Sequence, residues 1–151
     1  MEVVTCPERL GALRDDPLVF MGGGISNCPN WQQEIIPMFQ GQNVVLMNPR
    51  RDDFDITDKE MSRAQIYWEH DHLNAADAII FWFPKETLCP ITLFELGKYA
   101  AQGYQVFVGC HPEYARKFDV EVQLSLIDDT IQVYESLEEV VEVVTRWLRD
   151  F

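Results

Sequence analysis

Clusters of lysine and arginine are absent from this sequence, and no basic run is longer than a pair such as Arg50-Arg51. Acidic residues outnumber basic ones by 25 to 12, which gives a formal net charge of −13. A protein that binds a nucleic-acid polymer or an anionic membrane neutralises phosphates with grouped basic side chains. The composition therefore argues against both partners, whereas a small ligand in a locally neutral pocket is compatible with this charge.

The sequence also lacks long apolar runs, and we expect no secretory leader. The longest apolar stretch, residues 78–84, has the length of a strand, whereas a transmembrane helix needs about 20 apolar residues. A signal peptide has a basic segment followed by an apolar one. Residues 1–4 contain no basic residue and do not begin a long apolar stretch. We therefore expect a cytoplasmic protein without a membrane segment.

Closely spaced cysteines are absent too, since Cys6, Cys28, Cys89 and Cys110 form no C-x-x-C motif. This usage is typical of free thiols in a reducing compartment. Cys28, Cys89 and the Cys110-His111 pair each follow a predicted strand, so they could meet in space as a metal site. Because short ligand spacing is missing, we favour the alternative of thiols that pack near a cleft, and we expect no metal.

The apolar periodicity switches repeatedly between strand and helix. Buried strands are predicted at residues 18–21, 44–47, 77–83, 105–109 and 131–134. Helices are predicted at residues 30–40, 58–75, 90–102 and 136–148, while residues 114–127 follow neither pattern. This alternation indicates right-handed βαβ units. We therefore predict one α/β domain over residues 1–151, a flavodoxin-like or Rossmann-like three-layer sandwich with a five-stranded parallel sheet.

A glycine-rich turn follows the first predicted strand, with Gly22, Gly23 and Gly24 just before Ser26. Glycine lets a backbone approach a ligand closely, but the spacing fits neither the dinucleotide fingerprint nor the P-loop. In open parallel sheets, ligands bind beyond the carboxyl ends of the strands. The four residues are therefore candidate ligand contacts, and the alternative is a purely structural turn.

Glu95 is a candidate nucleophile. It lies in the second turn of a predicted helix, between Phe94 and Leu96, so its carboxylate is expected to be partly desolvated, which raises a carboxyl pKa. A carboxylate held in this way can attack an anomeric carbon and form a covalent glycosyl-enzyme. The alternative is an ordinary exposed glutamate on a helix.

Glu69 is a second candidate acid near the end of the preceding helix. It belongs to a mixed run with His70, Asp71 and His72. A carboxyl or imidazole group at this point could protonate a departing base. The alternative is a solvated helix face.

The remaining candidates are aromatic, amide and basic side chains. Trp31 and Trp68 could stack on a base, although tryptophans on helices also pack in cores. Asn48, Arg50 and Arg51 follow the second predicted strand, and arginine binds phosphate through its bidentate fork. A surface salt bridge is the alternative for the arginines.

Four segments together resemble the nucleoside 2-deoxyribosyltransferase superfamily, and most closely its nucleoside 2-deoxyribosyltransferase-like branch. They are residues 20–26, 48–51, 76–84 and 92–97, of which the Phe-Glu-Leu-Gly element at 94–97 is the most specific. The resemblance extends over about residues 18–110. It implies a flavodoxin-like fold and an enzyme that exchanges or hydrolyses the base of 2′-deoxynucleosides through a glutamate nucleophile.

The resemblance also assigns roles to single residues. It places the nucleophile on Glu95 and the acid that assists the departing base on Glu69. Phe20 stands where the family has a tyrosine that supports the nucleophile, and Cys89 falls at or near a sugar-binding aspartate. Family members complete one another's sites as oligomers, so the resemblance also implies a homo-oligomer.

Two classes of function follow from these observations. The first is cleavage or transfer of the N-glycosidic bond of a nucleoside or nucleotide, which needs no cofactor, with Arg50 or Arg51 favouring a 5′-phosphate. The second is a nucleotide-binding sensor that kept the fold and lost turnover, which the differences at Phe20 and Cys89 favour. Turnover separates the two, because a sensor binds its ligand without cleaving it.

Overall fold

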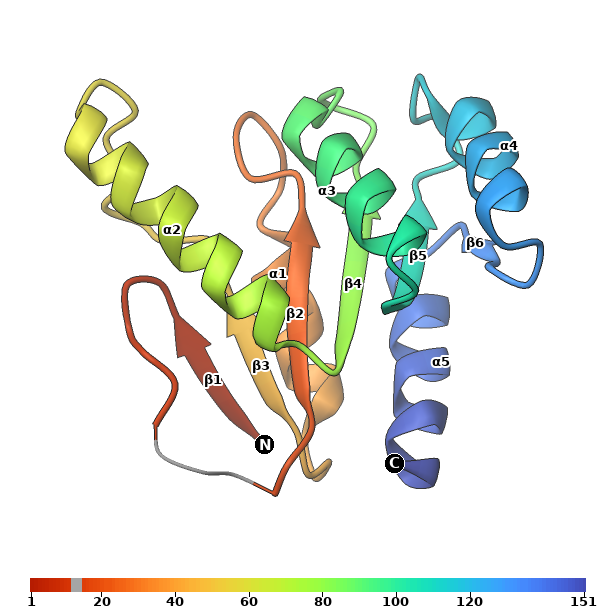
Figure 1. Cartoon of the computed structure of the whole chain (residues 1–151), viewed down its shortest axis with the longest axis horizontal. Helices are drawn as coiled ribbons and strands as arrows, with labels where there is room; N and C mark the ends of the chain where they lie inside the picture. The colour runs from red at the N-terminus through yellow and green to blue at the C-terminus, as the bar shows by residue number, and fades with distance from the viewer. Residues whose placement is uncertain (12–14) are drawn as a thin grey trace.

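A single parallel sheet organises the computed structural model, which describes residues 1–11 and 15–151 (Figure 1). Six strands lie in the order β1-β3-β2-β4-β5-β6, and each neighbouring pair is parallel. The strands are β1 (Glu2–Thr5), β2 (Leu18–Gly23), β3 (Val45–Asn48), β4 (Ala78–Phe83), β5 (Gln105–Cys110) and β6 (Val133–Tyr134).

Helices connect the strands from β2 onward, and side chains cap the first turns of α2 and α5. They are α1 (Trp31–Ile35), the 3₁₀ helix η1 (Ile36–Phe39), α2 (Lys59–Ala75), α3 (Pro90–Ala101), α4 (Lys117–Ile127) and α5 (Leu137–Asp150). The Asp58 carboxylate accepts backbone hydrogen bonds at the start of α2, and Ser136 with Glu139 forms a capping box at the start of α5. The helix α4 occupies the interval that followed neither periodic pattern.

The three-layer α/β prediction is confirmed, but the prediction of five strands is wrong by one. The additional strand, β1, pairs with β3 at the edge of the sheet. Its signal in the sequence is weak because the strand has four residues and buries only Val4 fully. The other five strands lie in the order 2-1-3-4-5, which is compatible with a flavodoxin-like fold.

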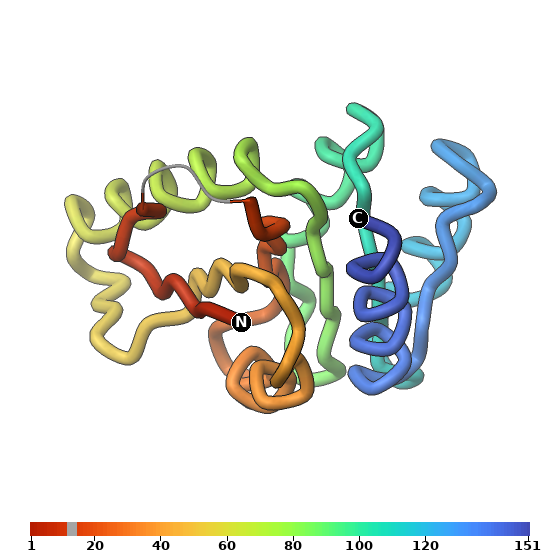
Figure 2. Tube along the Cα trace, turned by 90° about the horizontal axis from the view of Figure 1, so that it is seen from below, coloured from red at the N-terminus to blue at the C-terminus, as the bar shows by residue number. Residues whose placement is uncertain are grey.

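Two apolar cores lie on opposite faces of the sheet, because successive side chains of a strand point to opposite sides. In β4, Ile79, Phe81 and Phe83 pack into the core beneath α2, α3 and α4. The alternate side chains, including Ile80 and Trp82, pack against α1 and α5. Figure 2 shows the two groups of helices on either side of the sheet. The continuous burial of β4 is that of a central strand covered on both faces.

Parallel pairing brings the carboxyl ends of the strands to one edge of the sheet (Figure 1). The glycine turn after β2, the loop after β3 and the loop before α3 therefore meet there. None of the helices in the described part of the chain combines the length and the apolar character that a membrane span requires. The fold thus places the segments with the candidate site residues at one edge.

Candidate active site

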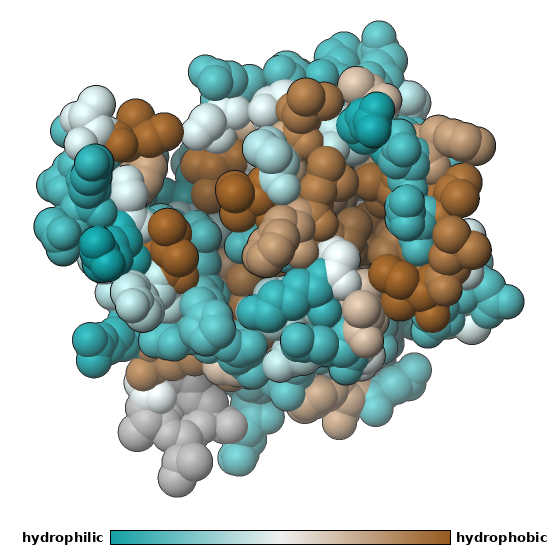
Figure 3. All heavy atoms as spheres, turned by 45° about the horizontal axis from the view of Figure 1, so that its top comes forward, coloured by the Kyte–Doolittle hydropathy of each residue, from teal (hydrophilic) through white to brown (hydrophobic). Residues whose placement is uncertain are grey.

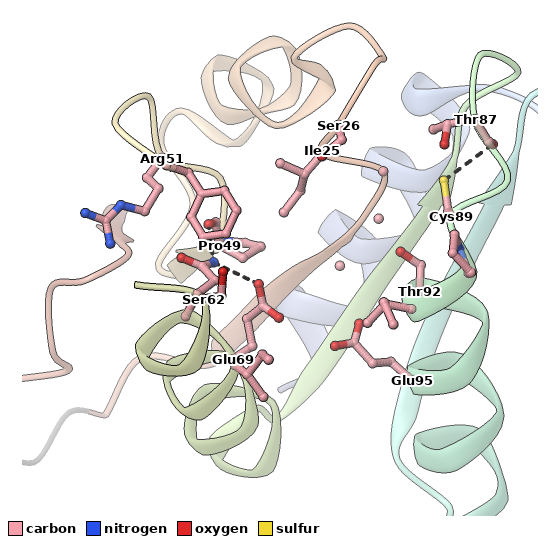
Figure 4. Close-up of a pocket in the computed structure, with 18 of the residues that line it drawn as sticks. Ile25, Ser26, Pro49, Arg51, Ser62, Glu69, Thr87, Cys89, Thr92 and Glu95 are labelled. Atoms are coloured by element: carbon pink, nitrogen blue, oxygen red, sulfur yellow. Dashed lines mark hydrogen bonds between the residues drawn. The ribbon is translucent and has the colours of Figure 1, made fainter. Parts of the chain in front are cut away.

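A cavity of about 510 Å³ opens at the carboxyl edge of the sheet, and α2 and α3 form two of its walls (Figure 4). The glycine turn after β2 and the loop after β3 complete it. Most of the lining surface is apolar. The lining residues are Phe20, Gly22, Gly23, Gly24, Ile25, Ser26, Pro49, Arg51, Phe54, Ile56, Ser62, Gln65, Ile66, Glu69, Thr87, Cys89, Pro90, Ile91, Thr92 and Glu95.

Two carboxyl groups face each other across this cavity. Glu69 projects from α2 and Glu95 from α3, and Figure 4 shows their side chains pointing toward one another. The helix α3 begins at Pro90, directly after Cys89. Thr92 and Glu95 are three residues apart and both line the cavity, as helical periodicity requires of neighbours on one face. The fold therefore brings together the two acids that the sequence analysis singled out.

Burial strongly perturbs the carboxyl group of Glu95. Its removal from water is the main cause that raises its pKa to about 8; the negative charge of Glu69 acts in the same direction, and Lys98 acts against the rise. Desolvation disfavours the charged form of a carboxyl group, and a like charge nearby acts in the same direction. Perturbed carboxyl groups that line a cleft are typical of catalytic sites.

A fixed amide orients the second carboxyl group. Gln65 Nε2 donates to Glu69 Oε1 at 2.8 Å and to the carbonyl oxygen of Pro49 at 2.7 Å. The Cys6 thiol donates to Gln65 Oε1 at 3.0 Å, so the amide is held from both ends. Burial raises the pKa of Glu69, while the hydrogen bond from Gln65 acts against this rise. Gln65 thus both positions the carboxylate and stabilises its ionised form.

The two carboxyl groups titrate as a pair. Since the charge of Glu69 contributes to the raised pKa of Glu95, which is about 8, an ionised Glu69 favours a protonated Glu95 near neutral pH. A pair that holds one proton between two facing carboxyl groups has one group available as a nucleophile and the other as an acid. The different environments of Glu95 and Glu69 therefore allow one carboxyl group to act as a nucleophile and the other as an acid.

Close packing explains two of the glycines in the turn after β2. A β-carbon at Gly23 would lie 2.5 Å from the carbonyl oxygen of Trp82, and one at Gly24 would lie 2.8 Å from Pro84 Cγ. The same β-carbon at Gly24 would lie 3.0 Å from Cys89 Sγ. Glycine is therefore required by packing at both positions, and the turn also lines the cavity together with Gly22 and Ser26.

The two arginines occupy different environments. Arg50 donates to the carbonyl oxygens of Pro29 at 2.7 Å and Cys28 at 3.0 Å, and it is outside the cavity lining. Arg51 lines the cavity, but its guanidinium group makes two hydrogen bonds to the Asp53 carboxylate, at 2.5 and 2.7 Å. The guanidinium group points away from Glu69 and Glu95 in Figure 4. Arg50 thus stabilises the loop after the glycine turn through its hydrogen bonds, and the charge of Arg51 is paired with that of Asp53.

Trp31, Trp68 and Asn48 lie outside the cavity lining. The indole of Trp31 is buried on the opposite face of the sheet and donates to the carbonyl oxygen of Gly24 at 2.9 Å. Trp68 stacks on His72, with ring centroids 3.8 Å apart, and donates to the carbonyl oxygen of Glu8 at 2.6 Å. Asn48 accepts a hydrogen bond from the Arg50 amide. All three support segments that line the cavity.

Phe20 and Cys89 bring apolar surface to the cavity. Phe20 is buried and presents a ring without a hydroxyl group. Cys89 has left-handed backbone dihedrals, with φ of 51°, and its thiol lies opposite Gly24. Cys6, Cys28, Cys89 and Cys110 are free thiols. Within residues 1–11 and 15–151, no group of three histidine, cysteine, aspartate or glutamate side chains is arranged to hold a metal ion.

Four polar lining residues were missed in the sequence analysis, Ser62, Gln65, Thr87 and Thr92, and two of them, Gln65 and Thr92, lie beside the acids. Each precedes one of the acids by about one helical turn, Gln65 by four residues from Glu69 and Thr92 by three residues from Glu95. Residues at these spacings lie on one helix face. This periodicity is the signal that identifies them once the acids are chosen.

The described geometry agrees with a comparison against protein families. The model of the family "Nucleoside 2-deoxyribosyltransferase like" matches residues 16–114, about two thirds of the chain. This segment includes the glycine turn, Glu69, Cys89 and Glu95, which all line the cavity. No curated protein matches the sequence. The family match confirms the resemblance noted in the sequence, and the chain belongs to the nucleoside 2-deoxyribosyltransferase-like family.

Proposed function

We propose that the protein cleaves or transfers the N-glycosidic bond of a nucleoside through a covalent glycosyl intermediate on Glu95. The observation that carries this proposal is the pair of facing carboxyl groups in a mostly apolar cavity. In-line displacement at an anomeric carbon needs a nucleophile on one side and an acid near the leaving group on the other. The facing of Glu95 and Glu69 fits this requirement (Figure 4).

The first half of the reaction forms the glycosyl ester. A proton passes from Glu95 to Glu69, which leaves Glu95 ionised and Glu69 protonated. A Glu95 carboxylate oxygen then bonds to C1′ while the bond from C1′ to the base nitrogen breaks. The electron pair of the broken bond leaves with the base, and the base takes the proton of Glu69.

The second half releases the sugar. Water, or a nitrogen of a second base, attacks C1′ of the glycosyl ester, and the ester bond to Glu95 breaks. The Glu69 carboxylate accepts the proton that the attacking group loses. Water as acceptor gives hydrolysis and a second base gives transfer, and neither path needs a metal or an organic cofactor, because the substrate supplies the leaving group.

The test is a panel of 2′-deoxynucleosides and ribonucleosides, each incubated with and without a second free base. Chromatography measures base release and base exchange, with Glu95→Ala as the control. We expect release or exchange from at least one nucleoside and its loss in the variant. Binding of a nucleoside without turnover across the panel contradicts the enzymatic proposal and instead supports a ligand-binding sensor.

We also propose that a second copy of the chain covers the mouth of the cavity. Apolar side chains are exposed around it, notably Ile56 (75%), Ile91 (66%) and Phe94 (72%), and Figure 3 shows apolar surface on this edge of the molecule. Covering them would bury apolar area and exclude water from the cavity. Because each chain carries a net charge of −13, added salt should strengthen the association.

Light scattering coupled to gel filtration tests this association. Phe94→Glu should shift the protein toward monomer, whereas Phe118→Glu, which changes an equally exposed side chain on α4 outside the cavity lining, should not. A monomer in the unmodified protein at micromolar concentration and high salt would contradict the proposal.

A further inference from the structure

We propose that the substrate is a nucleoside with a small uncharged 5′ group, such as 5′-deoxy or 5′-alkylthio, and that Cys89 helps to select it. This inference rests on the proposed function, because it takes Glu95 as the nucleophile. It depends on three observations. They are the positions of Glu95 and Glu69 on opposite sides of the cavity, the location of the charged side chains around it, and the neutral thiol of Cys89 at one end.

The two acids fix how a nucleoside can lie. The attacking oxygen, C1′ and the base nitrogen must be roughly collinear, so the base lies toward Glu69 and the sugar carbon C1′ lies over Glu95. The rest of the sugar extends sideways from this line. We place the sugar on the side of the cavity that is lined by the glycine turn and by residues at the start of α3, including Cys89 and Thr92 (Figure 4).

No cation lines the end of the cavity where the 5′ group would lie. Among the described lining residues, Arg51 is the only basic side chain, and it comes from the loop after β3 on the opposite side of the cavity (Figure 4). Its charge is already matched by the Asp53 carboxylate. Lys85 is outside the lining and pairs with Glu113 at 3.1 Å. A 5′-phosphate would therefore enter a space near the Glu69 carboxyl group in which no described lining residue offers a basic side chain without an internal partner, and this disfavours the phosphate.

The side chain at this end is a neutral thiol. Burial raises the pKa of Cys89 to about 12, so the group is uncharged over the physiological range. Its thiol donates to the carbonyl oxygen of Thr87, at 3.6 Å. A buried thiol behaves as a small apolar group. It is therefore a poor acceptor for a 5′-hydroxyl and a suitable contact for a methyl or alkylthio group.

The backbone at Cys89 supports a role for this side chain. Left-handed dihedrals are less favourable for a residue with a β-carbon than for glycine, and Cys89 adopts them with φ of 51°. The dihedrals direct the thiol toward Gly24, where a β-carbon would lie only 3.0 Å from Sγ. The thiol and the glycine turn thus form one continuous apolar wall around the sugar.

The test compares three nucleosides that share one base and one sugar and differ only at the 5′ position: 5′-monophosphate, 5′-hydroxyl and 5′-methylthio. The base is the one released fastest in the panel above, or each common base in turn if none is released. We expect kcat/KM for the methylthio compound to exceed that for the monophosphate by at least tenfold. Calorimetry on Glu95→Gln measures the dissociation constants of the same three compounds, so binding is read independently of turnover.

Variants at Cys89 separate a specific role from a structural one. Cys89→Asp should lower kcat/KM for the methylthio compound about tenfold or more and shift the preference toward the 5′-hydroxyl compound, whereas Cys89→Ala should keep the wild-type order. Cys28→Ser is the matched control, because Cys28 is a half-buried thiol outside the cavity lining.

The outcomes distinguish this inference from the proposed function. Absence of turnover together with tighter binding of the methylthio compound contradicts the glycosidic reaction but supports the selection of an uncharged 5′ group. A monophosphate that is cleaved faster or bound more tightly overturns the inference and leaves the reaction intact. Binding of none of the three compounds contradicts both.

Discussion

Two cavities open at the carboxyl edge of the same sheet, one on each face, and they differ in how far their glutamate side chains are exposed to solvent. The first lies between α2 and α3 and holds Glu69 and Glu95. The second, of about 340 Å³, lies between α1 and the start of α5 and is lined by Trp31, Trp82, Pro84, His111 and four glutamates. All four of these glutamates are exposed to solvent.

Both cavities contain acids, so the comparison shows that burial, rather than the presence of an acid, determines whether the pKa of a carboxyl group is raised. In the first cavity, desolvation and mutual repulsion raise the pKa of Glu95 to about 8, which a solvated carboxylate does not undergo. In the second cavity, the glutamates Glu34, Glu86, Glu135 and Glu138 extend into water. The two cavities thus provide matched pairs of variants, one acid half-buried and one exposed.

The largest effect is expected from removal of the half-buried nucleophile, Glu95. Glu95→Gln should lower kcat by roughly 10³-fold or more, because no other group can form the glycosyl ester. Glu138→Gln changes an exposed acid of the second cavity and should leave kcat within about twofold. Steady-state kinetics on both variants, with circular dichroism as a check of folding, measures the difference. An equal loss of kcat in Glu95→Gln and Glu138→Gln would contradict the assignment of the reaction to the first cavity.

Removal of the acid should have a smaller effect that depends on the leaving group. Glu69→Gln should lower kcat by about 10²-fold for an ordinary base, the typical contribution of a general acid. For a nucleoside whose base already carries a positive charge, such as a 7-methylated purine, the loss should be at most about tenfold, because that base departs without a proton.

The control for the acid is Glu34→Gln, an exposed glutamate of the second cavity, which should not change either rate. The kcat of the wild type and of Glu69→Gln, measured with each of the two leaving groups, gives the loss for each base. The same loss for both bases would show that Glu69 has only a structural role.

The glycine turn between the cavities should be sensitive to a single methyl group. Gly24→Ala should lower the free energy of unfolding by about 2 kcal/mol, because the new β-carbon would lie 2.8 Å from Pro84 Cγ. Gly97→Ala is the matched control: beyond its chain neighbours and the backbone of its own helix, no atom of the described residues lies within 4 Å of the new β-carbon, and alanine stabilises a helix by roughly 0.5–1 kcal/mol relative to glycine. Urea denaturation measures both variants, and a stable Gly24→Ala protein would contradict the packing of this turn.

The smallest effect is a dependence of stability on pH. Folding raises the pKa of Glu95 from 4.5 to about 8, so the folded protein binds this proton more tightly than the unfolded chain does. The contribution is fully present below about pH 4.5 and is lost as the pH rises to about 8. Between pH 6 and pH 8, the free energy of unfolding should therefore fall by ~1–2 kcal/mol from this group.

The variant Glu95→Gln should remove this part of the pH dependence, whereas Glu138→Gln should retain it. Urea denaturation at several pH values provides the comparison. Identical pH profiles for the wild type and Glu95→Gln would show that the carboxyl group is not buried as described.

The sequence predicted those parts of the fold that depend on strong periodicity. The strand β4 was expected at residues 77–83 and occurs at Ala78–Phe83, because a strand buried on both faces has a continuous apolar run. The strand β1 was missed, because an edge strand of four residues has little apolar signal. The helix α4 was missed because its outer face carries apolar side chains such as Phe118 and Leu126, which obscure the amphipathic pattern.

The candidate site was predictable in its position but not in its details. Parallel topology and the family resemblance placed Glu69 and Glu95 at one edge of the sheet. The sequence did not reveal which of Arg50 and Arg51 lines the cavity, because the difference depends on carbonyl groups of the loop near Pro29. It also did not reveal that Trp31 lies on the opposite face of the sheet, because a short helix of five residues has no clear periodicity.

The most direct test of the central claim is to trap the intermediate on Glu95. A nucleoside with fluorine at C2′ should form the glycosyl ester and release it slowly, because the electron-withdrawing fluorine slows the attack of water on C1′. Mass spectrometry of the intact protein and of its peptides should show one added fluorinated glycosyl group, located on Glu95. An adduct on another residue, or turnover of the natural nucleoside with no adduct from its fluorinated analogue under conditions where that analogue binds, would contradict the covalent mechanism.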